Sequence, residues 1–447
     1  MDDLKAAVCA AIDDEREKIL AVGDEILRNP ELGYKERKTS ALTLSLFREL
    51  GLQNITRHAL TGLKGWARGR SHGSRLALIG ELDAVCCPGH PHADPATGAA
   101  HACGHNAQIA ALYGCGLGLS AANALKELDG DLCFFATPAE EYVEIEYRRG
   151  LIRDGKIAHI GGKQELIAEG AFDDIDLAMM VHSEADYPAP RVVVGGPAMG
   201  FIGKAVRFIG KEAHAGGAPE KGINALNAAS LAIMGINAQR ETFRDEDSVR
   251  VHPIVTKGGD LVNIVPADVR MESYVRAGSV PAMLDADRKV NRAIRGAAYM
   301  VGARAEIDDL PGYLPLAQDR QMSALFAANA VRLLGKEAVF AGLPFAGSTD
   351  MGDLGAVMPV IQPTVSGFSG AAHSSGFAVR DPDTAVLLPA KLMAMTAIDL
   401  LSDGAGEARK ICGAFPRKTP AQYETVWREI LSGGSGDAPA EERRPTC

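Results

Sequence analysis

The chain alternates between short apolar runs and longer amphipathic segments. Apolar residues recur at helical spacing through most of the first ~60 residues, which predicts helices there. Short apolar runs at 75–80, 131–136 and 176–181 predict buried strands, and the apolar segment 108–123 predicts a helix between the first two. Strands that alternate with helices favour an α/β fold, which we expect to have a mixed central sheet flanked by helices.

Each of the three apolar runs leads into polar side chains. Glu81 and Asp83 follow the first run, Glu140 and Glu141 follow the second, and His182 follows the third. Open α/β sheets place their sites at the carboxyl ends of their strands. We therefore expect these five side chains to lie at one edge of the sheet.

A second α/β layer interrupts this pattern. It begins after about residue 197 and contains strand and helix patterns at 204–209, 222–240, 249–256, 271–277, 280–299 and 303–307. The sequence therefore predicts an inserted domain at 197–311 and an outer domain built from 1–196 and 312–447. Residues 432–447 are rich in Gly, Ser, Pro and charge, so we expect disorder there.

Composition and charge exclude several classes of partner. The 447 residues include 47 basic and 57 acidic side chains, a net charge of −10, which argues against a nucleic-acid or membrane partner. The first 20 residues carry acidic side chains where a signal peptide would be basic, and no run approaches the ~20 apolar residues of a membrane span. The 8 cysteines show no disulfide spacing. We expect a cytoplasmic protein.

The string HACGHNAQ at 101–108 carries the main chemical signal. It places the thiol of Cys103 two residues from the imidazole of His105, a pair that suits a borderline transition metal. Taken alone, the pair would more often be a packed thiol beside a histidine. Further donors at Glu140 and Glu141, His182 and His373 favour a dispersed metal site with one spare carboxylate.

Several strings together resemble a known family. They are NPELGYKE at 29–36, HACGHN at 101–106, PAEE at 138–141, VH at 181–182, GKEAHAGGAPEKGINAL at 210–226 and NIVPADVRMESYVRA at 263–277. In this combination the chain resembles the aminoacylase and glutamate-carboxypeptidase metallohydrolase family. It is most similar to the amidohydrolase branch of hippurate, auxin-conjugate and aminobenzoyl-glutamate hydrolases and related dipeptidases. The resemblance implies a catalytic α/β domain interrupted by a smaller α/β lid domain that usually forms a homodimer.

The resemblance also implies roles for the donors. One or two divalent transition-metal ions, most often zinc or manganese, would be held by Cys103, His105, Glu141, His182 and His373. Cys103 would bridge the ions if two bind, and Glu140 resembles the general base. Asp83 is best interpreted as a residue that orients a ligand. Glu81 belongs to the same outer shell.

In the inserted domain, the resemblance assigns substrate contacts. His214 resembles the histidine that reaches across the dimer to the developing oxyanion. Asn263 and Arg276 match positions that hold the substrate's carbonyl and terminal carboxylate. Because a guanidinium binds a carboxylate through two parallel hydrogen bonds, the expected partner is a small carboxylate-bearing substrate.

The sequence departs from the family pattern at a few points. Glu81 stands where His or Asp is frequent, which leaves open an altered or absent second metal site, and Asn106 stands where the hippurate-type enzymes have Asp. The segments 86–100 and 142–159 are longer than in the family, and we expect them to reshape the pocket. Asp350, like Asp353, is interpreted as a helix cap.

The sequence leaves three functional hypotheses open. The leading hypothesis is a metal-dependent hydrolase of an amide bond in an N-acyl or aminobenzoyl amino acid or a dipeptide. The first rival is a metal-dependent hydrolytic deaminase of an amino-aromatic acid, of the nitroanthranilate type. The second rival is an inactive relative that only binds carboxylates.

Overall fold

The computed structural model describes residues 1–434, which fall into two compact units. The first unit contains Met1–Pro197, Leu316–Phe345 and Asp350–Ala421, and the second contains Ala198–Pro315, Ala346–Thr349 and residues 422–434. The sequence assigned everything after residue 311 to the outer domain, whereas most of helix α13 (Pro420–Gly434) groups with the second unit. Residues 432–434, where we expected disorder, end this helix, and 435–447 lie outside the described residues.

The first unit is built on a six-stranded mixed sheet. Its strands, in spatial order, are β1 (Gln53–His58), β2 (Gly62–Ala67), β6 (Gly130–Thr137), β3 (Ser74–Glu81), β7 (Leu177–Met179) and β16 (Val360–Ile361). The pairs β1–β2 and β2–β6 are antiparallel, and the remaining pairs are parallel. The expected mixed sheet is therefore confirmed, although β1 replaces the helix expected up to residue 60 because the chain turns back to form an edge hairpin with β2.

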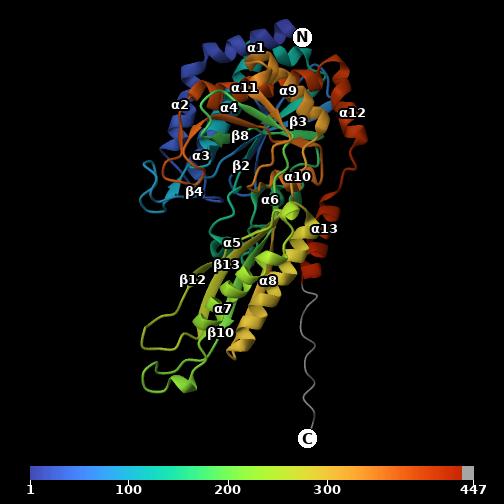
Figure 1. Ribbon diagram of the computed structural model, residues 1–447. Helices are drawn as coiled ribbons and strands as arrows, with labels where there is room; N and C mark the ends of the chain where they lie inside the picture. Colours follow the sequence, from blue (N-terminus) through green and yellow to red (C-terminus); the bar gives the residue numbers. More distant parts are fainter. Residues whose placement is uncertain (435–447) are drawn as a thin grey trace. The chain divides into compact units, whose positions relative to one another are not determined.

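Helices cover this sheet (Figure 1). The N-terminal helices are α1 (Asp2–Asp14), α2 (Arg16–Leu27) and α3 (Arg37–Glu49). Helix α4 (His105–Ala121) is buried nearly all round, as its uniformly apolar sequence predicts. Its glycines allow close packing, since a Cβ at Gly118 would meet the Ile12 side chain at 2.5 Å. Its position matters for function because its first turn carries the metal motif.

Helix α11 (Leu388–Leu401) packs against α4, as the two labels in Figure 1 suggest. Together with the preceding turn, the helix spans Asp383–Leu401 with a mean hydropathy of 1.6, which is long and apolar enough to cross a membrane. This finding corrects the expectation that no segment of the chain approaches the length and apolarity of a membrane span. The stretch is 89% buried inside the protein, as in the core helix of a globular domain.

A second sheet lies in the same unit. It contains β15 (Val339–Ala341), β9 (Val192–Val194), β17 (Thr364–Ser369), β18 (Ala378–Val379) and β8 (His182–Ala185). The third apolar run thus ends earlier than expected, at Met179. His182 begins β8 and pairs with Thr364 of β17, so the second sheet fixes its backbone.

Several further elements belong to the first unit. They are the hairpin β4 (Val85–Cys86) and β5 (Ala99–Ala100), and the helices α5 (Ile145–Arg153), α6 (Gly162–Ala168), α9 (Arg320–Leu334), α10 (Met351–Gly355) and α12 (Gly406–Ala414). Both long segments noted in the sequence thus acquire structure: 86–100 folds back between β4 and β5, and 142–159 contains α5.

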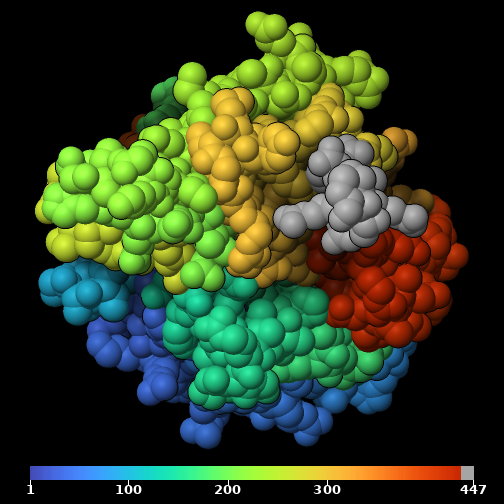
Figure 2. All heavy atoms as spheres, turned by 90° about the horizontal axis from the view of Figure 1, so that it is seen from below, coloured from blue at the N-terminus to red at the C-terminus, as the bar shows by residue number. Residues whose placement is uncertain are grey.

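The second unit contains an antiparallel sheet and two helices, in addition to most of α13. Its strands are β11 (Arg250–Val251), β12 (Ile254–Lys257), β13 (Asp268–Ala277), β10 (Gly200–Ile209) and β14 (Arg304–Tyr313), so the single strand expected at 249–256 is split in two. Burial alternates strictly along β13, as in a strand with one covered face. Helices α7 (Ala225–Ala238) and α8 (Val280–Met300) pack on each other, and their lime-green and gold atoms adjoin in Figure 2.

Candidate metal centre

The Cys103–His105 pair lies in the tight turn that enters α4. Gly104, the N-cap of this helix, has φ 89°, a left-handed conformation that glycine adopts without strain. A Cβ there would also meet the side chain of Ser183 at 3.0 Å. The glycine between the two donors is therefore required both by the backbone conformation and by the close approach of β8.

The ring of His105 is held in one orientation by Asp83. Its Nδ1 lies 2.8 Å from the Asp83 backbone oxygen and 3.4 Å from that residue's Oδ1, while Asp83 Oδ2 accepts the backbone N–H of Glu141 at 2.9 Å. Asp83 thus orients two candidate ligands at once. The hydrogen bond at Nδ1 directs the lone pair of His105 to Nε2, the nitrogen available for a metal.

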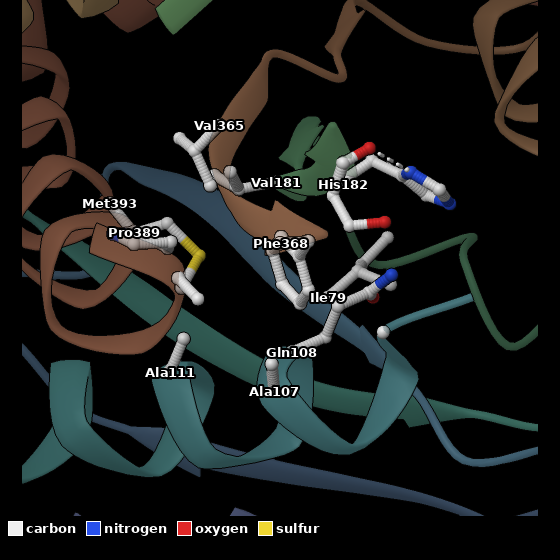
Figure 3. Close-up of a pocket in the computed structure, with 13 residues that line it drawn as sticks. Ile79, Ala107, Gln108, Ala111, Val181, His182, Val365, Phe368, Pro389 and Met393 are labelled. Carbon is white, nitrogen blue, oxygen red and sulfur yellow. Dashed lines mark hydrogen bonds between the residues drawn. The ribbon is translucent and has the colours of Figure 1, made fainter. Parts of the chain in front are cut away.

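His182 reaches the same thiol from the second sheet. Its Nδ1 lies 3.0 Å from the Ser183 backbone oxygen and its Nε2 lies 3.5 Å from Cys103 Sγ. Figure 3 shows His182 at the edge of a small apolar cavity lined by side chains such as Val181 and Phe368. The imidazole points away from this cavity, and its Nε2 faces the Cys103 thiol.

Glu141 and His373 form the other side of the cluster. His373 Nε2 lies 3.0 Å from Glu141 Oε1, and the backbone N–H of His373 donates to Ala102 at 2.8 Å. His373 has φ 61°, which is uncommon for a residue other than glycine and is often found at functional sites. The loop of His373 is thus fixed against the segment that leads into Cys103.

Among the described residues, the donors fall into three overlapping groups. Within each group the ligand atoms lie within 4.8 Å of one another: Cys103, His105 and His182; Cys103, Glu141 and His373; Glu81, His105 and Glu140. The five ligands proposed from the sequence all lie in the first two groups, which share the thiol.

The residues present fit a divalent transition metal. His105 Nε2 and Glu141 Oε1 are buried and make no hydrogen bond, although each lies near an oppositely charged group. Such atoms are costly unless a ligand satisfies them. One thiol, three imidazoles and a carboxylate form a donor set typical of zinc and its neighbours.

The charges in the cluster favour the metal-binding forms. Burial and the Glu141 charge raise the pKa of Cys103, but His182 and His105 outweigh them and lower this pKa to about 6. Burial also raises the pKa of Glu141, but the neighbouring His373 lowers it to about 2. The thiolate and the carboxylate are therefore both accessible at neutral pH, as a metal requires.

Glu140 belongs to the third group and lies in a more acidic setting. It is 6% exposed, and burial together with the charges of Glu81, Glu141 and Asp350 holds its pKa well above the usual range. A carboxyl with high proton affinity is suited to accept a proton near neutral pH. Of the two adjacent glutamates, Glu140 is therefore the one that binds a proton more strongly.

Lys163 is the site residue that sequence reasoning missed. Its side chain is fully buried, and its Nζ lies 2.5 Å from Glu81 and 2.5 Å from Asp350. The helix-cap interpretation of Asp350 is wrong, because this side chain makes no cap hydrogen bond at α10 and binds Lys163 instead. The sequence around Lys163 does not differ from that around a solvent-exposed lysine near the start of a helix, so no local pattern marks it as buried.

The remaining candidates lie in the second unit. His214 is exposed, and its Nδ1 accepts the N–H groups of Gly216 and Gly217 at 3.2 and 2.8 Å, which orients the ring. Asn263 lies beside it, since its backbone oxygen accepts the N–H of Ala215 at 3.0 Å. Arg276 lies on β13, with its guanidinium over the rings of Phe201 and Tyr274. The structure therefore brings His214 and Asn263 together within this unit.

Comparison with known proteins identifies the family. Residues 77–389, more than half of the chain, match Peptidase family M20/M25/M40. The chain belongs to this family. The family expected from the sequence motifs is thus confirmed, and with it a metal-dependent amidohydrolase.

Several known proteins are similar to this chain over most of its length. The Xaa-Arg dipeptidase of Mus musculus is 28% identical and covers 89% of this chain, and 89% of its own length is matched. The N-acetylcysteine deacetylase of Bacillus subtilis is 26% identical over 72% of this chain and 82% of its own length. A dinuclear metal-binding M20 peptidase from Bacillus subtilis has the same fold, with a TM-score of 0.65 at 21% identity over 87% of this chain and 99% of that one.

Proposed function

We propose that this M20 enzyme hydrolyses the amide bond of a dipeptide or an N-acyl amino acid that carries a free carboxylate. The observation that carries the proposal is the convergence of Cys103, His105, Glu141, His182 and His373 into two groups that share one thiol. The dipeptidase and deacetylase activities named for the two relatives support this substrate class.

Each residue of the site has a separate role in the proposed reaction. A bound divalent cation supplies Lewis acidity and lowers the pKa of water toward ~7. Glu140 accepts the proton of the attacking water and returns it to the leaving amine. His214 is proposed to donate to the developing oxyanion, a contribution on the order of 3 kcal/mol for a well-placed donor. Asn263 would hold the substrate carbonyl, and Arg276 would bind the carboxylate through its planar guanidinium.

The decisive experiment is a substrate panel assayed with metal added and with metal chelated. We expect turnover of some dipeptides or N-acyl amino acids, including aminobenzoyl-glutamate, and its loss with the chelator. Ammonia release from an aminobenzoate without amide cleavage would favour the deaminase instead. No turnover across the panel with metal bound would support the inactive carboxylate-binding relative.

A pair of matched variants tests the base. Glu140→Gln should lower kcat by about 10²-fold or more, because a general base contributes roughly 10²–10⁴-fold, while metal content stays at the wild-type value. Glu165→Gln is the control, since Glu165 of α6 is also buried but accepts the backbone N–H groups of Ala158 and His159, which precede the helix. Activity that survives in Glu140→Gln would refute the assignment.

We also propose that one or two zinc or manganese ions bind. Cys103 would be a ligand of both ions if two bind, because its thiol belongs to both the first and the second donor group. Metal analysis of the purified protein, together with reconstitution by each ion, measures both identity and number. A single ion at saturation would exclude the bridged pair.

A homodimer through the second unit is a further part of the proposal. Strand β12 lies at an edge of the sheet, and its Ile254 is 61% exposed. Val262, in the loop that follows β12 in the sequence, is fully exposed. Exposed apolar edge strands are surfaces on which a second chain can pair. Light scattering should show a dimer that Ile254→Lys dissociates, whereas Tyr299→Lys, at another exposed apolar side chain, should not. A monomeric wild type would refute the proposal.

We propose a cytoplasmic location. The cysteines of the described residues are all free, which fits a reducing compartment. Fractionation of cells that express the full chain tests this, and recovery from the medium or the membrane would contradict it.

A further inference from the structure

Three buried carboxylates gather beside the metal donors. Glu81 and Asp350 are 0% exposed and Glu140 is 6% exposed. Glu81 and Glu140 both face His105: their oxygens lie 3.1 and 3.9 Å from its Nε2. Two of these carboxylates, Glu81 and Glu140, make up the third donor group together with His105, a set of side chains that could hold a cation.

A metal ion in this third group would interfere with the proposed mechanism. It would bind the Glu140 oxygens that must accept a proton. For Glu140 to act as the base, a divalent cation must therefore be kept away from it while the five ligands remain able to bind metal.

Lys163 has the position and the charge for this role. Its ammonium lies 2.5 Å from Glu81 Oε1 and 2.5 Å from Asp350 Oδ1, and its backbone N–H donates to the other Asp350 oxygen at 3.0 Å. The second Glu81 oxygen accepts from the Gln108 amide at 2.9 Å. Both Glu81 oxygens are thus engaged, and a fixed positive charge lies against the carboxylate that the third donor group would use.

The burial of this ammonium strengthens the effect. A charge with no exposed surface is poorly screened, so it repels a second cation more strongly than a surface lysine would. The pair with Asp350 joins segments 187 residues apart in sequence, which fixes the ammonium in place from two sides.

We propose that Lys163 acts as an internal cation that excludes a metal ion from the Glu81–His105–Glu140 group and so preserves Glu140 as the base. Lys163 is a positioning residue, since it touches neither substrate nor the reacting atoms. The proposal takes the role of Glu140 from the proposed function, but it makes a separate claim about how many ions the chain binds.

The test counts metal ions in the full chain. Wild type and Lys163→Met are stripped with a chelator, saturated with Zn²⁺ and analysed for bound zinc per chain, with folding checked by circular dichroism. We expect Lys163→Met to bind about one ion more than wild type. We also expect its kcat to fall on the order of 10²-fold with little change in KM, because Glu140 becomes a ligand.

Three further variants make the result specific. Lys163→Arg keeps the charge and should keep the wild-type zinc content. The double variant Glu81→Gln/Lys163→Met should lose the extra ion, since Glu81 supplies its carboxylate. Lys5→Met is the matched control, because Lys5 is also buried and lies 2.5 Å from Asp399 but outside the metal donors. If Lys163→Met does not fold, Lys163→Gln, which can hydrogen-bond to both acids, takes its place.

Each outcome decides the proposal. Unchanged zinc content in a folded, neutral Lys163 variant overturns it, and so does an extra ion that leaves kcat unchanged. If the wild type turns over no substrate in the panel, the proposed function fails, but the zinc count still tests the exclusion of metal by Lys163.

Discussion

Replacing Gly162 with alanine should displace the segment that carries the proposed base. A Cβ at this position would lie 1.6 Å from the backbone oxygen of Pro138 and 2.7 Å from its carbonyl carbon. Because contacts below 3.0 Å are essentially never seen, the two backbones must separate by at least 1.4 Å. Neither group is the end of a flexible side chain, so the strain cannot be relieved locally.

The displacement reaches the catalytic group directly. Pro138 precedes Glu140 by two residues, and the N–H of Gly162 donates to Ala139 at 3.0 Å, so the segment moves as one. A misplacement of about 1 Å at a reacting group costs on the order of 10²-fold in rate. Overpacking of this kind costs roughly 1–3 kcal/mol in the free energy of unfolding. Gly162→Ala should therefore lose both activity and stability.

The assay compares kcat/KM on the best substrate of the panel with the midpoint of thermal unfolding. Gly413→Ala in α12 is the control, because a Cβ there meets nothing within 4 Å and should stabilise the helix by up to about 1 kcal/mol. If Gly162→Ala keeps wild-type kcat/KM and stability, the tight contact with Pro138 does not position Glu140 and the reasoning fails.

Three further predictions address other parts of the molecule. Burial, together with the Asp83 charge, raises the pKa of Glu36 from 4.5 to about 7, so its contribution to stability is present below pH 4.5 and is lost as pH rises through 7. Glu36→Gln, which cannot ionise, should remove this loss, on the order of 3 kcal/mol, and denaturation curves that depend on pH as in wild type would contradict this. Cys103→Ser should weaken zinc binding at both donor groups, measured by competition with a chelator; full wild-type affinity would exclude the shared thiol. Lys204→Met in the second unit should cost about 3–5 kcal/mol in unfolding free energy because it leaves the buried Asp287 without its cation, and an unchanged denaturant midpoint would refute this.

Much of the site could be predicted from the sequence. Glu81, Glu140 and Glu141 follow apolar runs, and strand ends of a parallel sheet meet at one edge, so their proximity follows from local periodicity. The pair Cys103 and His105 is fixed by a glycine turn within three residues. Such signals depend only on neighbours in the chain, which is why they can be recognised before the fold is known.

Other features were decided by tertiary structure alone. His182 owes its position to pairing of β8 with β17, and β1 became a strand because it pairs with β2. Asp350 was interpreted as a helix cap because its partner Lys163 lies 187 residues away, and no local pattern announces that contact. The sequence therefore determined which side chains have the chemistry for a metal centre. Only long-range packing decided how the buried charged side chains pair with one another, as Lys163 does with Asp350. Such pairing depends on which distant segments come together in space, and local sequence patterns do not show this.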